Sequence, residues 1–258
     1  MEINGQSTDN ILEQKFKELM ETANSITPEM EAEYEEKERQ RLHQEGLSRI
    51  ARSNDYAEIP KRFWNCTFDK YPSEISEEVK QLCLKEDSDA ILLLCGTTGR
   101  GKTTTLSCAM HERAYNGLDA GLYFSVRNLE MELRRCRTFG ATEDEKTWMR
   151  RLSLTPFLCL DEVGTCPNKA EEVAFEVNLL SARYDNCLKT FIATNYTPME
   201  FKAHLCNVNI EGKTEQELRE LSAYLDKNVI IMNRIKSVAI VKTLVGESYR
   251  GAANGNIQ

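Results

Sequence analysis

Residues 96–103, "GTTGRGKT", have the types and spacing of a phosphate-binding loop, and they lie between the apolar run "ILLLC" and a helical stretch. Glycines permit a tight turn that points backbone N–H groups at phosphate oxygens, and the helix start adds the positive end of its dipole. Lys102 supplies a cation for the β- and γ-phosphates, and the Thr103 hydroxyl can bind Mg²⁺. The predicted nucleotide-binding residues here are Gly96, Thr97, Thr98, Gly99, Arg100, Gly101, Lys102, Thr103 and Thr104.

An acidic pair, Asp161 and Glu162, closes the apolar stretch "FLCL". Asp161 is suited to hold Mg²⁺ through its water shell. Glu162 is the next residue along and faces differently, so it can orient or deprotonate an attacking water. The sequence therefore predicts Thr103 and Asp161 as metal-binding residues and Glu162 as a catalytic base.

Asn195 ends a third stretch with chemical potential, "TFIATN". A polar side chain at the end of a buried strand can reach the γ-phosphate or the attacking water. Magnesium, a carboxylate base and a polar residue around one phosphate chain favour hydrolysis over storage, because a protein that only holds nucleotide does not need the base. Lys102, Glu162 and Asn195 are the catalytic residues predicted in this region.

The elements that must position these residues alternate between strand and helix. Apolar strands are predicted at 90–95, 120–126, 155–163 and 189–195, and helices at 103–117, 127–137 and 170–186. This alternation is typical of an α/β fold in which helices cover both faces of a parallel sheet, a three-layer sandwich.

The first 57 residues differ in character from the rest. A helix over 11–23 carries an apolar stripe of Leu12, Phe16, Leu19 and Met20, which can bind a partner or pack on the chain's own domain. Thr27-Pro28 begins a second helix that is polar on nearly every side. The pattern breaks near residues 55–60, so we predict a helical, partner-binding segment at 1–57 and a nucleotide-binding domain at 58–258.

The composition is that of an ordinary globular protein. Of 258 residues, 41% are hydrophobic and 29% are charged, and the net charge is −8, of which −6 falls in residues 1–50. No secretory signal or apolar run long enough for a membrane span is visible, so we expect a cytoplasmic protein with no membrane partner. Nine scattered cysteines without a C-x-x-C pair indicate reduced, mostly buried thiols.

The order of five segments gives a resemblance to a known family. "IPKRFWNCTFDKY", the phosphate loop, "FLCLDEVG", "NLLSARYDNCLKTFIATN" and "IIMNRIKSVAIV...SYRG" resemble, in that order, the DnaC-type helicase loaders and the IstB-type transposition ATPases of the AAA+ superfamily. The similarity covers roughly residues 58–251.

The resemblance implies further residues and ligands. Arg234, in "MNRI", matches an arginine that reaches the nucleotide of a neighbouring subunit, and Arg250, in "ESYRG", resembles one that contacts nucleotide in the same subunit. It also implies ATP and Mg²⁺ as cofactors, a homo-oligomer that forms on ATP binding, and little or no helical lid after the ATPase domain. The segment 202–222 looks like an insertion relative to the family.

Single-stranded DNA is the second ligand that the resemblance implies. Five arginines in two short clusters are candidate contacts for its phosphates: Arg134, Arg135, Arg137, Arg150 and Arg151. The sequence-based interpretation is an ATPase that loads a replicative DNA helicase during DNA replication. Alternatives are an IstB-like transposition regulator and a nucleotide-gated adaptor with little turnover; a small-molecule kinase is disfavoured, since no arginine-rich phosphate lid is apparent.

Overall fold

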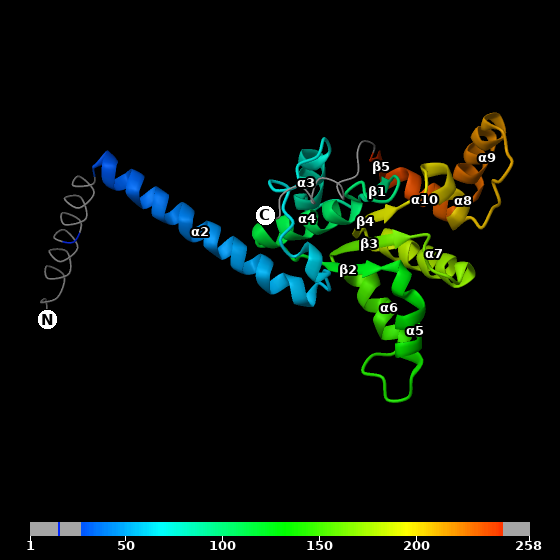
Figure 1. Ribbon diagram of the computed structural model, residues 1–258, viewed down its shortest axis with the longest axis horizontal. Coiled ribbons are helices and arrows are strands. Elements are labelled where there is room, and N and C mark those ends of the chain that lie inside the picture. Colours follow the sequence, from blue (N-terminus) through cyan, green and yellow to red (C-terminus); the bar gives the residue numbers. More distant parts are fainter. Residues whose placement is uncertain (1–14, 16–26, 245–258) are drawn as a thin grey trace, which may run out of the picture. The chain divides into compact units, whose positions relative to one another are not determined.

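The computed structural model describes Lys15 and residues 27–244 (Figure 1). Their regular elements follow one another in this order: α2 (Pro28–Tyr56), η1 (Lys61–Phe63), α3 (Ser76–Leu84), β1 (Ile91–Cys95), α4 (Lys102–Tyr115), β2 (Leu122–Ser125), η2 (Val126–Asn128), α5 (Leu129–Arg137), α6 (Glu145–Leu154), β3 (Phe157–Val163), α7 (Lys169–Asp185), β4 (Lys189–Thr194), α8 (Pro198–Leu205), α9 (Glu215–Asn228), α10 (Ile230–Val238) and β5 (Ala239–Thr243).

The five strands form one sheet in the order β2-β3-β4-β1-β5, and every neighbouring pair is parallel. β4 therefore lies between β1, which leads into the phosphate loop, and β3, which carries the acidic pair near its carboxyl end. Because all strands run the same way, their carboxyl ends meet at one edge of the sheet, where ligands of open α/β sheets bind. The predicted parallel α/β sheet is confirmed.

Helices cover both faces of this sheet (Figure 1), and the strand residues alternate between two apolar cores. In β1, Ile91 and Leu93 join the core built with α5 to α10, whereas Leu92 and Leu94 join the core built with α3 and α4. All five β1 residues are buried, which explains why this strand is an unbroken apolar run in the sequence. The three-layer arrangement follows from this two-sided burial.

Helix α2 begins as predicted, because the Thr27 hydroxyl accepts a hydrogen bond from Met30 N at 3.3 Å. The chain divides by its internal contacts into two units, 1–48 and 49–258, and each is compact by itself. The division lies inside α2, upstream of the predicted 57/58 boundary. The last turns of the helix belong to the second unit: Asn54 is buried there against His111, and Ala57 O accepts a hydrogen bond from Tyr123 N. The predicted helix at 11–23 lies outside the described residues.

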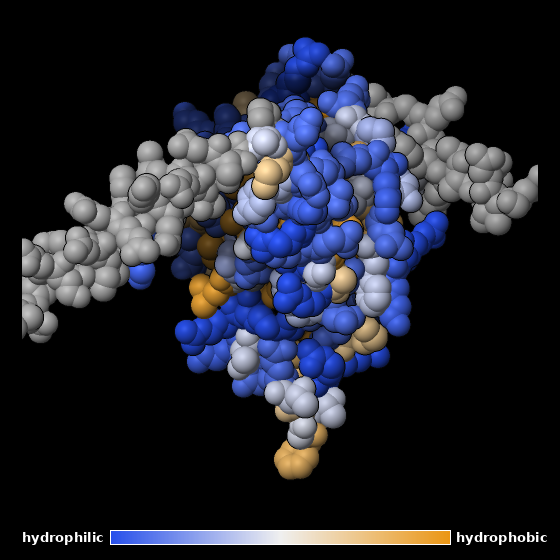
Figure 2. Space-filling view, turned by 90° about the vertical axis from the view of Figure 1, so that its left-hand side faces the viewer, coloured by the Kyte–Doolittle hydropathy of each residue, from blue (hydrophilic) through white to orange (hydrophobic). Residues whose placement is uncertain are grey.

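The loop between α5 and α6 carries an apolar tip at the bottom of Figure 2. Phe139, in this loop, is fully exposed.

The segment 202–222 is structured: α9 begins with a capping box formed by Thr214 and Glu217, and Lys202 pairs with Asp226 at 2.7 Å. This contact fixes α8 against α9.

Seven of the nine cysteines are buried and none forms a disulfide, in agreement with the sequence-based interpretation. Across residues 27–244, none of the helices combines the length and apolar character that crossing a bilayer requires.

Candidate nucleotide-binding site

The predicted phosphate loop connects β1 to α4 and has the backbone that its glycines allow. Gly96, Gly99 and Gly101 all have positive φ, at 136°, 87° and 82°. A Cβ at Gly96 would lie 2.6 Å from the Leu244 carbonyl oxygen, so glycine is also required there by space. The first turn of α4 has no side-chain cap, which leaves its N–H groups available for an anion.

Lys102 connects the loop to the strand beside it. Its Nζ donates to the carbonyl oxygens of Gly96 at 2.6 Å and Thr97 at 2.9 Å, and to Asn195 Oδ1 at 3.0 Å. Lys102 is buried, which lowers its pKa, while the nearby Asp161 opposes that shift. Lys102 and Asn195, each predicted separately as a catalytic residue, are therefore in direct contact, with the ammonium at the mouth of the loop.

Asp161 lies near the end of β3, with only 2% of its surface exposed. Its Oδ2 accepts a 2.7 Å hydrogen bond from the Tyr123 hydroxyl, and its Oδ1 accepts one from Glu162 N at 2.8 Å. Burial raises the pKa of this carboxyl, and hydrogen bonds from the Thr103 and Tyr123 hydroxyls lower it. Thr103 and Asp161, the two predicted metal-binding residues, are thus adjacent, and they offer the hard oxygen donors that Mg²⁺ prefers.

Glu162 faces another direction because the backbone changes there. The register of β3 against β4 shifts between Leu160 and Val163, and Glu162 has a φ of +56°. Its carboxylate accepts a hydrogen bond from the Ser125 hydroxyl at 2.6 Å and pairs with Arg127 at 3.1 Å. The predicted base is therefore held by two side chains from the end of β2 and η2.

Three residues at this site were not predicted from the sequence: Tyr123, Ser125 and Arg127. All follow from the sheet order, because β2 pairs with β3 and places Ser125 directly beside Asp161. The polar residue ending the strand "LYFS" was the available signal. It could not be used without knowing which strand neighbours β3.

The structure does not bring Arg234 to these residues. It lies in the middle of α10, the helix that leads directly into β5. Its guanidinium pairs with Asp185 at 3.3 Å and lies 5.6 Å from the Tyr184 ring centroid. Asp185 ends α7 just before β4 begins. Both residues therefore precede strand starts, at the edge of the sheet opposite the phosphate loop. Arg250 lies outside the described residues.

The arginine clusters considered for DNA are mostly paired with acids. Arg135 and Arg151 both contact Glu143, Arg137 contacts Glu145, and Arg134 contacts Glu130. Of the five, only Arg150 makes no ion pair among the described residues. Any DNA phosphate that approached α5 would have to compete with these glutamates.

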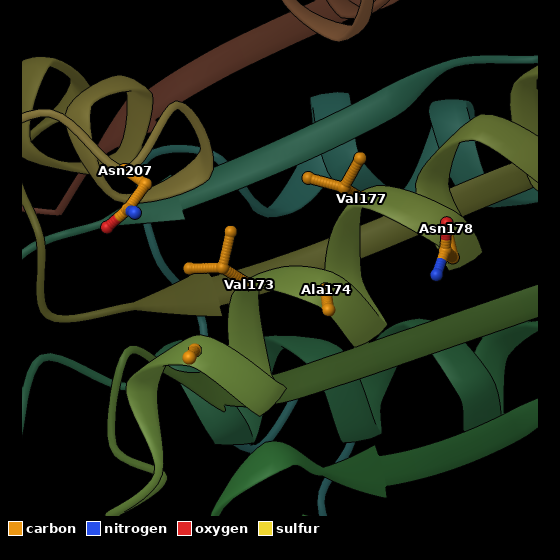
Figure 3. Close-up of a pocket in the computed structure, with 6 residues that line it drawn as sticks. Val173, Ala174, Val177, Asn178 and Asn207 are labelled. Atoms are coloured by element: carbon orange, nitrogen blue, oxygen red, sulfur yellow. The ribbon is translucent and has the colours of Figure 1, made fainter.

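A shallow groove of about 310 Å³ lies on the solvent side of α7 (Figure 3). Val173, Ala174 and Val177 line it, together with Asn207 from the chain after α8. It contains none of the predicted nucleotide-binding residues.

The sequence profile of the "IstB-like ATP binding protein" family matches residues 12–212. The chain belongs to this family. ATP is the nucleotide that membership implies, and the geometry of the loop, Lys102 and Asp161 is consistent with it. A search of curated proteins finds no significant match.

Several solved structures share the fold of this chain. The DnaC helicase loader gives a TM-score of 0.52 at 19% identity, covering 72% of this chain and all of that one. DnaI gives 0.52 at 20% identity, covering 74% and 93%. The replication initiator DnaA, bound to AMPPCP and single-stranded DNA, gives 0.50 at 14% identity, covering 73% and 51%. At these identities the likeness shows the fold alone.

Proposed function

We propose that this IstB-like protein hydrolyses ATP to ADP and phosphate. The observation that carries the proposal is the convergence of Lys102, Asp161, Glu162 and Asn195 at the carboxyl edge of one sheet, with Lys102 Nζ bonded to Asn195 Oδ1 at 3.0 Å. A binding site alone requires the loop and Lys102. The carboxylate of Glu162 beside them is the group that water attack requires.

Each side chain has a distinct role in this proposal. Loop N–H groups and Lys102 hold the β- and γ-phosphates. Asn195 accepts a hydrogen bond from Lys102 and so positions its ammonium beside the γ-phosphate. Thr103 and Asp161 hold Mg²⁺, which supplies positive charge to the phosphate oxygens when bound. Glu162 accepts a proton from the attacking water, and release of its carboxylate from Ser125 and Arg127 would free it to turn toward that water.

We further propose that Arg234 acts on the site of a neighbouring subunit. Within its own chain it lies at the opposite edge of the sheet, so it can complete a nucleotide site only across an interface. An arginine that arrives in this way stabilises negative charge in the transition state. Hydrolysis would then depend on a homo-oligomer that forms on ATP binding.

The biological role we propose is the loading of a replicative DNA helicase in the cytoplasm during DNA replication. The segment 1–57 would bind the helicase, and the ATPase domain, 58–258, would bind single-stranded DNA. Support comes from the shared fold with the DnaC and DnaI structures and from the acidic composition of the N-terminal segment.

Capture experiments with the full chain as bait separate this role from the runner-up. We expect a purified hexameric replicative helicase to be retained, and the changes Leu12→Ala, Phe16→Ala and Leu19→Ala together to abolish retention. Retention of a transposase instead would support an IstB-like transposition regulator, the alternative that the family match favours.

A third candidate is an adaptor that binds ATP and switches partners with little turnover. The hold of Ser125 and Arg127 on Glu162 favours it, because a restrained base slows hydrolysis. Steady-state phosphate release with and without single-stranded DNA distinguishes the two. We expect DNA to stimulate release; a rate that stays near zero with DNA, ATP and helicase present would favour the adaptor.

DNA binding is tested by fluorescence anisotropy with a labelled single strand. We expect affinity to fall as salt rises, and the triple change Arg134→Ala, Arg135→Ala and Arg137→Ala to weaken binding and reduce the salt slope. An unchanged affinity in the triple variant would remove α5 as a contact, in line with its ion pairs to glutamates.

A further inference from the structure

A second group of possible metal ligands lies between α7 and α8, apart from the nucleotide site. Glu172 and Glu176 are one helical turn apart on α7, so their side chains share a face, and His204 faces them from α8. One carboxylate oxygen of each glutamate and a ring nitrogen of His204 lie within 4.8 Å of one another. Glu172 and Glu176 are buried, with 0% and 1% of their surface exposed.

Glu176 is incompletely bonded in this position. Its Oε2 contacts His204 Nε2 at 2.7 Å, but its buried Oε1 has no hydrogen-bond partner among the described residues. A buried carboxylate oxygen without a partner is costly, and native structures rarely leave one. Burial raises the pKa of the Glu176 carboxyl, and the contact with His204 opposes that shift.

Glu172 has partners, but they leave the pair of carboxylates short of cations. Its Oε1 accepts hydrogen bonds from Gly164 N at 2.8 Å and Cys166 N at 3.3 Å, and its Oε2 pairs with Lys169 at 3.2 Å. Half of the Lys169 side chain is exposed, so this lysine can move aside into water. Two buried carboxylates thus face a single displaceable ammonium and one imidazole.

We propose that Glu172, Glu176 and His204 bind a divalent transition-metal cation such as Mn²⁺. Carboxylates suit Mn²⁺ and imidazole suits the later metals of the same row, so the mixed set is typical of this class. Because the three ligand atoms already lie within 4.8 Å of one another, small side-chain rotations would place them around one cation. To coordinate the cation, Nε2 of His204 must be free of a proton, so the proton that lies between Nε2 and Glu176 Oε2 passes to solvent and the neutral ring carries its proton on Nδ1.

The cation would tie α8 and α7 to the turn that follows the predicted catalytic base. Glu172 already holds Gly164 and Cys166, and Thr165 Oγ1 in the same turn donates to Glu162 O at 2.6 Å. Tyr196, which packs on His204 with ring centroids 5.2 Å apart, donates to Gly164 O from the other side. This site is distinct from the Mg²⁺ site at Thr103 and Asp161 and does not depend on ATP hydrolysis.

The test is a titration of the full-length, nucleotide-free protein with Mn²⁺. Binding is measured as the decrease in the electron paramagnetic resonance signal of free Mn²⁺. Mn²⁺ is the probe because the exposed Cys187 and half-buried Cys206 would compete for Zn²⁺. Asp161→Asn serves as the background, since it removes a carboxylate of the nucleotide-site metal. We expect one Mn²⁺ to remain bound in this background. Absence of any bound Mn²⁺ there would overturn the proposal.

Three further changes in that background identify the ligands. Glu176→Gln keeps the size of the side chain and should weaken Mn²⁺ binding at least about tenfold. Lys169→Met removes the competing ammonium and should tighten binding. Glu171→Gln alters a partly exposed neighbour on the same helix, which pairs with Arg137, and should leave the Mn²⁺ affinity unchanged. Equal affinity in the Glu176→Gln and Glu171→Gln proteins would contradict the site, and circular dichroism confirms that each variant is folded.

Discussion

The two edges of the sheet differ in what a single chain provides. At the carboxyl edge, Lys102, Asp161, Glu162 and Asn195 converge from three neighbouring strands and are bonded within the site. At the amino edge, Arg234 pairs with Asp185 and packs on Tyr184, and within residues 27–244 it contacts none of the predicted phosphate-binding groups. This contrast underlies our proposal that nucleotide binding is built into the monomer, whereas full hydrolysis requires a second subunit to bring its amino edge to the first subunit's loop.

The largest effect is expected from Arg234→Ala. Loss of a transition-state cation supplied in trans should lower assembly-stimulated hydrolysis by about 10³-fold or more, while ATP affinity stays unchanged. Phosphate release measured across protein concentrations tests this. Lys236→Ala, on the same helix and paired only with Asp226 among the described residues, is the matched control and should keep the wild-type rate. If the wild-type monomer hydrolyses at full rate when dilute, Arg234 has no role in trans.

The next largest loss of hydrolysis is expected from Glu162→Gln. Removing a general base typically costs about 10²–10⁴-fold in rate, and the amide retains the shape of the side chain. In single-turnover assays the hydrolysis rate should therefore fall. The affinity for a fluorescent ATP analogue should stay at the wild-type value. Hydrolysis at the wild-type rate would remove Glu162 as the base.

A change in the opposite direction is expected from Ser125→Ala. Its hydroxyl holds the Glu162 carboxylate at 2.6 Å, and a hydrogen bond to a charged group is worth about 1.5–3 kcal/mol, so basal hydrolysis without DNA should rise roughly tenfold or more. Arg127→Ala should raise it less, because exposed ion pairs contribute only about 0–1 kcal/mol. A lower basal rate in both variants would mean that these residues position Glu162 for catalysis.

Asp185→Ala should have the smallest effect. The pair with Arg234 is partly exposed, so freeing the guanidinium changes the energy by about 0–1 kcal/mol and stimulated hydrolysis rises by at most about fivefold. The measurement is the same concentration series used for Arg234→Ala. A loss as large as that of Arg234→Ala would show that Asp185 orients the arginine.

The site residues that could be predicted from the sequence are those that directly follow or end an apolar strand. The phosphate loop, Asp161 with Glu162, and Asn195 each follow an apolar strand, and strand ends of a parallel sheet must meet, so their convergence was predictable. Tyr123, Ser125 and Arg127 were not, because their contacts depend on the pairing of β2 with β3. The register shift at Glu162 could not be predicted, because it depends on local backbone geometry. Nor could the glutamate partners of the arginine clusters, because several of them are distant in the sequence.

The boundary of the N-terminal segment also differs between the sequence-based prediction and the structure. A pattern break near residues 55–60 marks the end of the α2 helix, but packing begins earlier, where Ile50 and Ser53 become buried in the second unit. Helix continuity concealed that change, because helical periodicity alone does not say which turns have neighbours.

Mixing two inactive variants tests the shared site most directly. Arg234→Ala subunits keep Glu162, and Glu162→Gln subunits keep Arg234, so a mixed oligomer with head-to-tail contacts places an intact base beside an intact arginine at about one interface in four. The predicted result is that an equal mixture regains ATP hydrolysis that neither variant shows alone. A mixture no more active than its two components would contradict a nucleotide site completed by the neighbouring subunit.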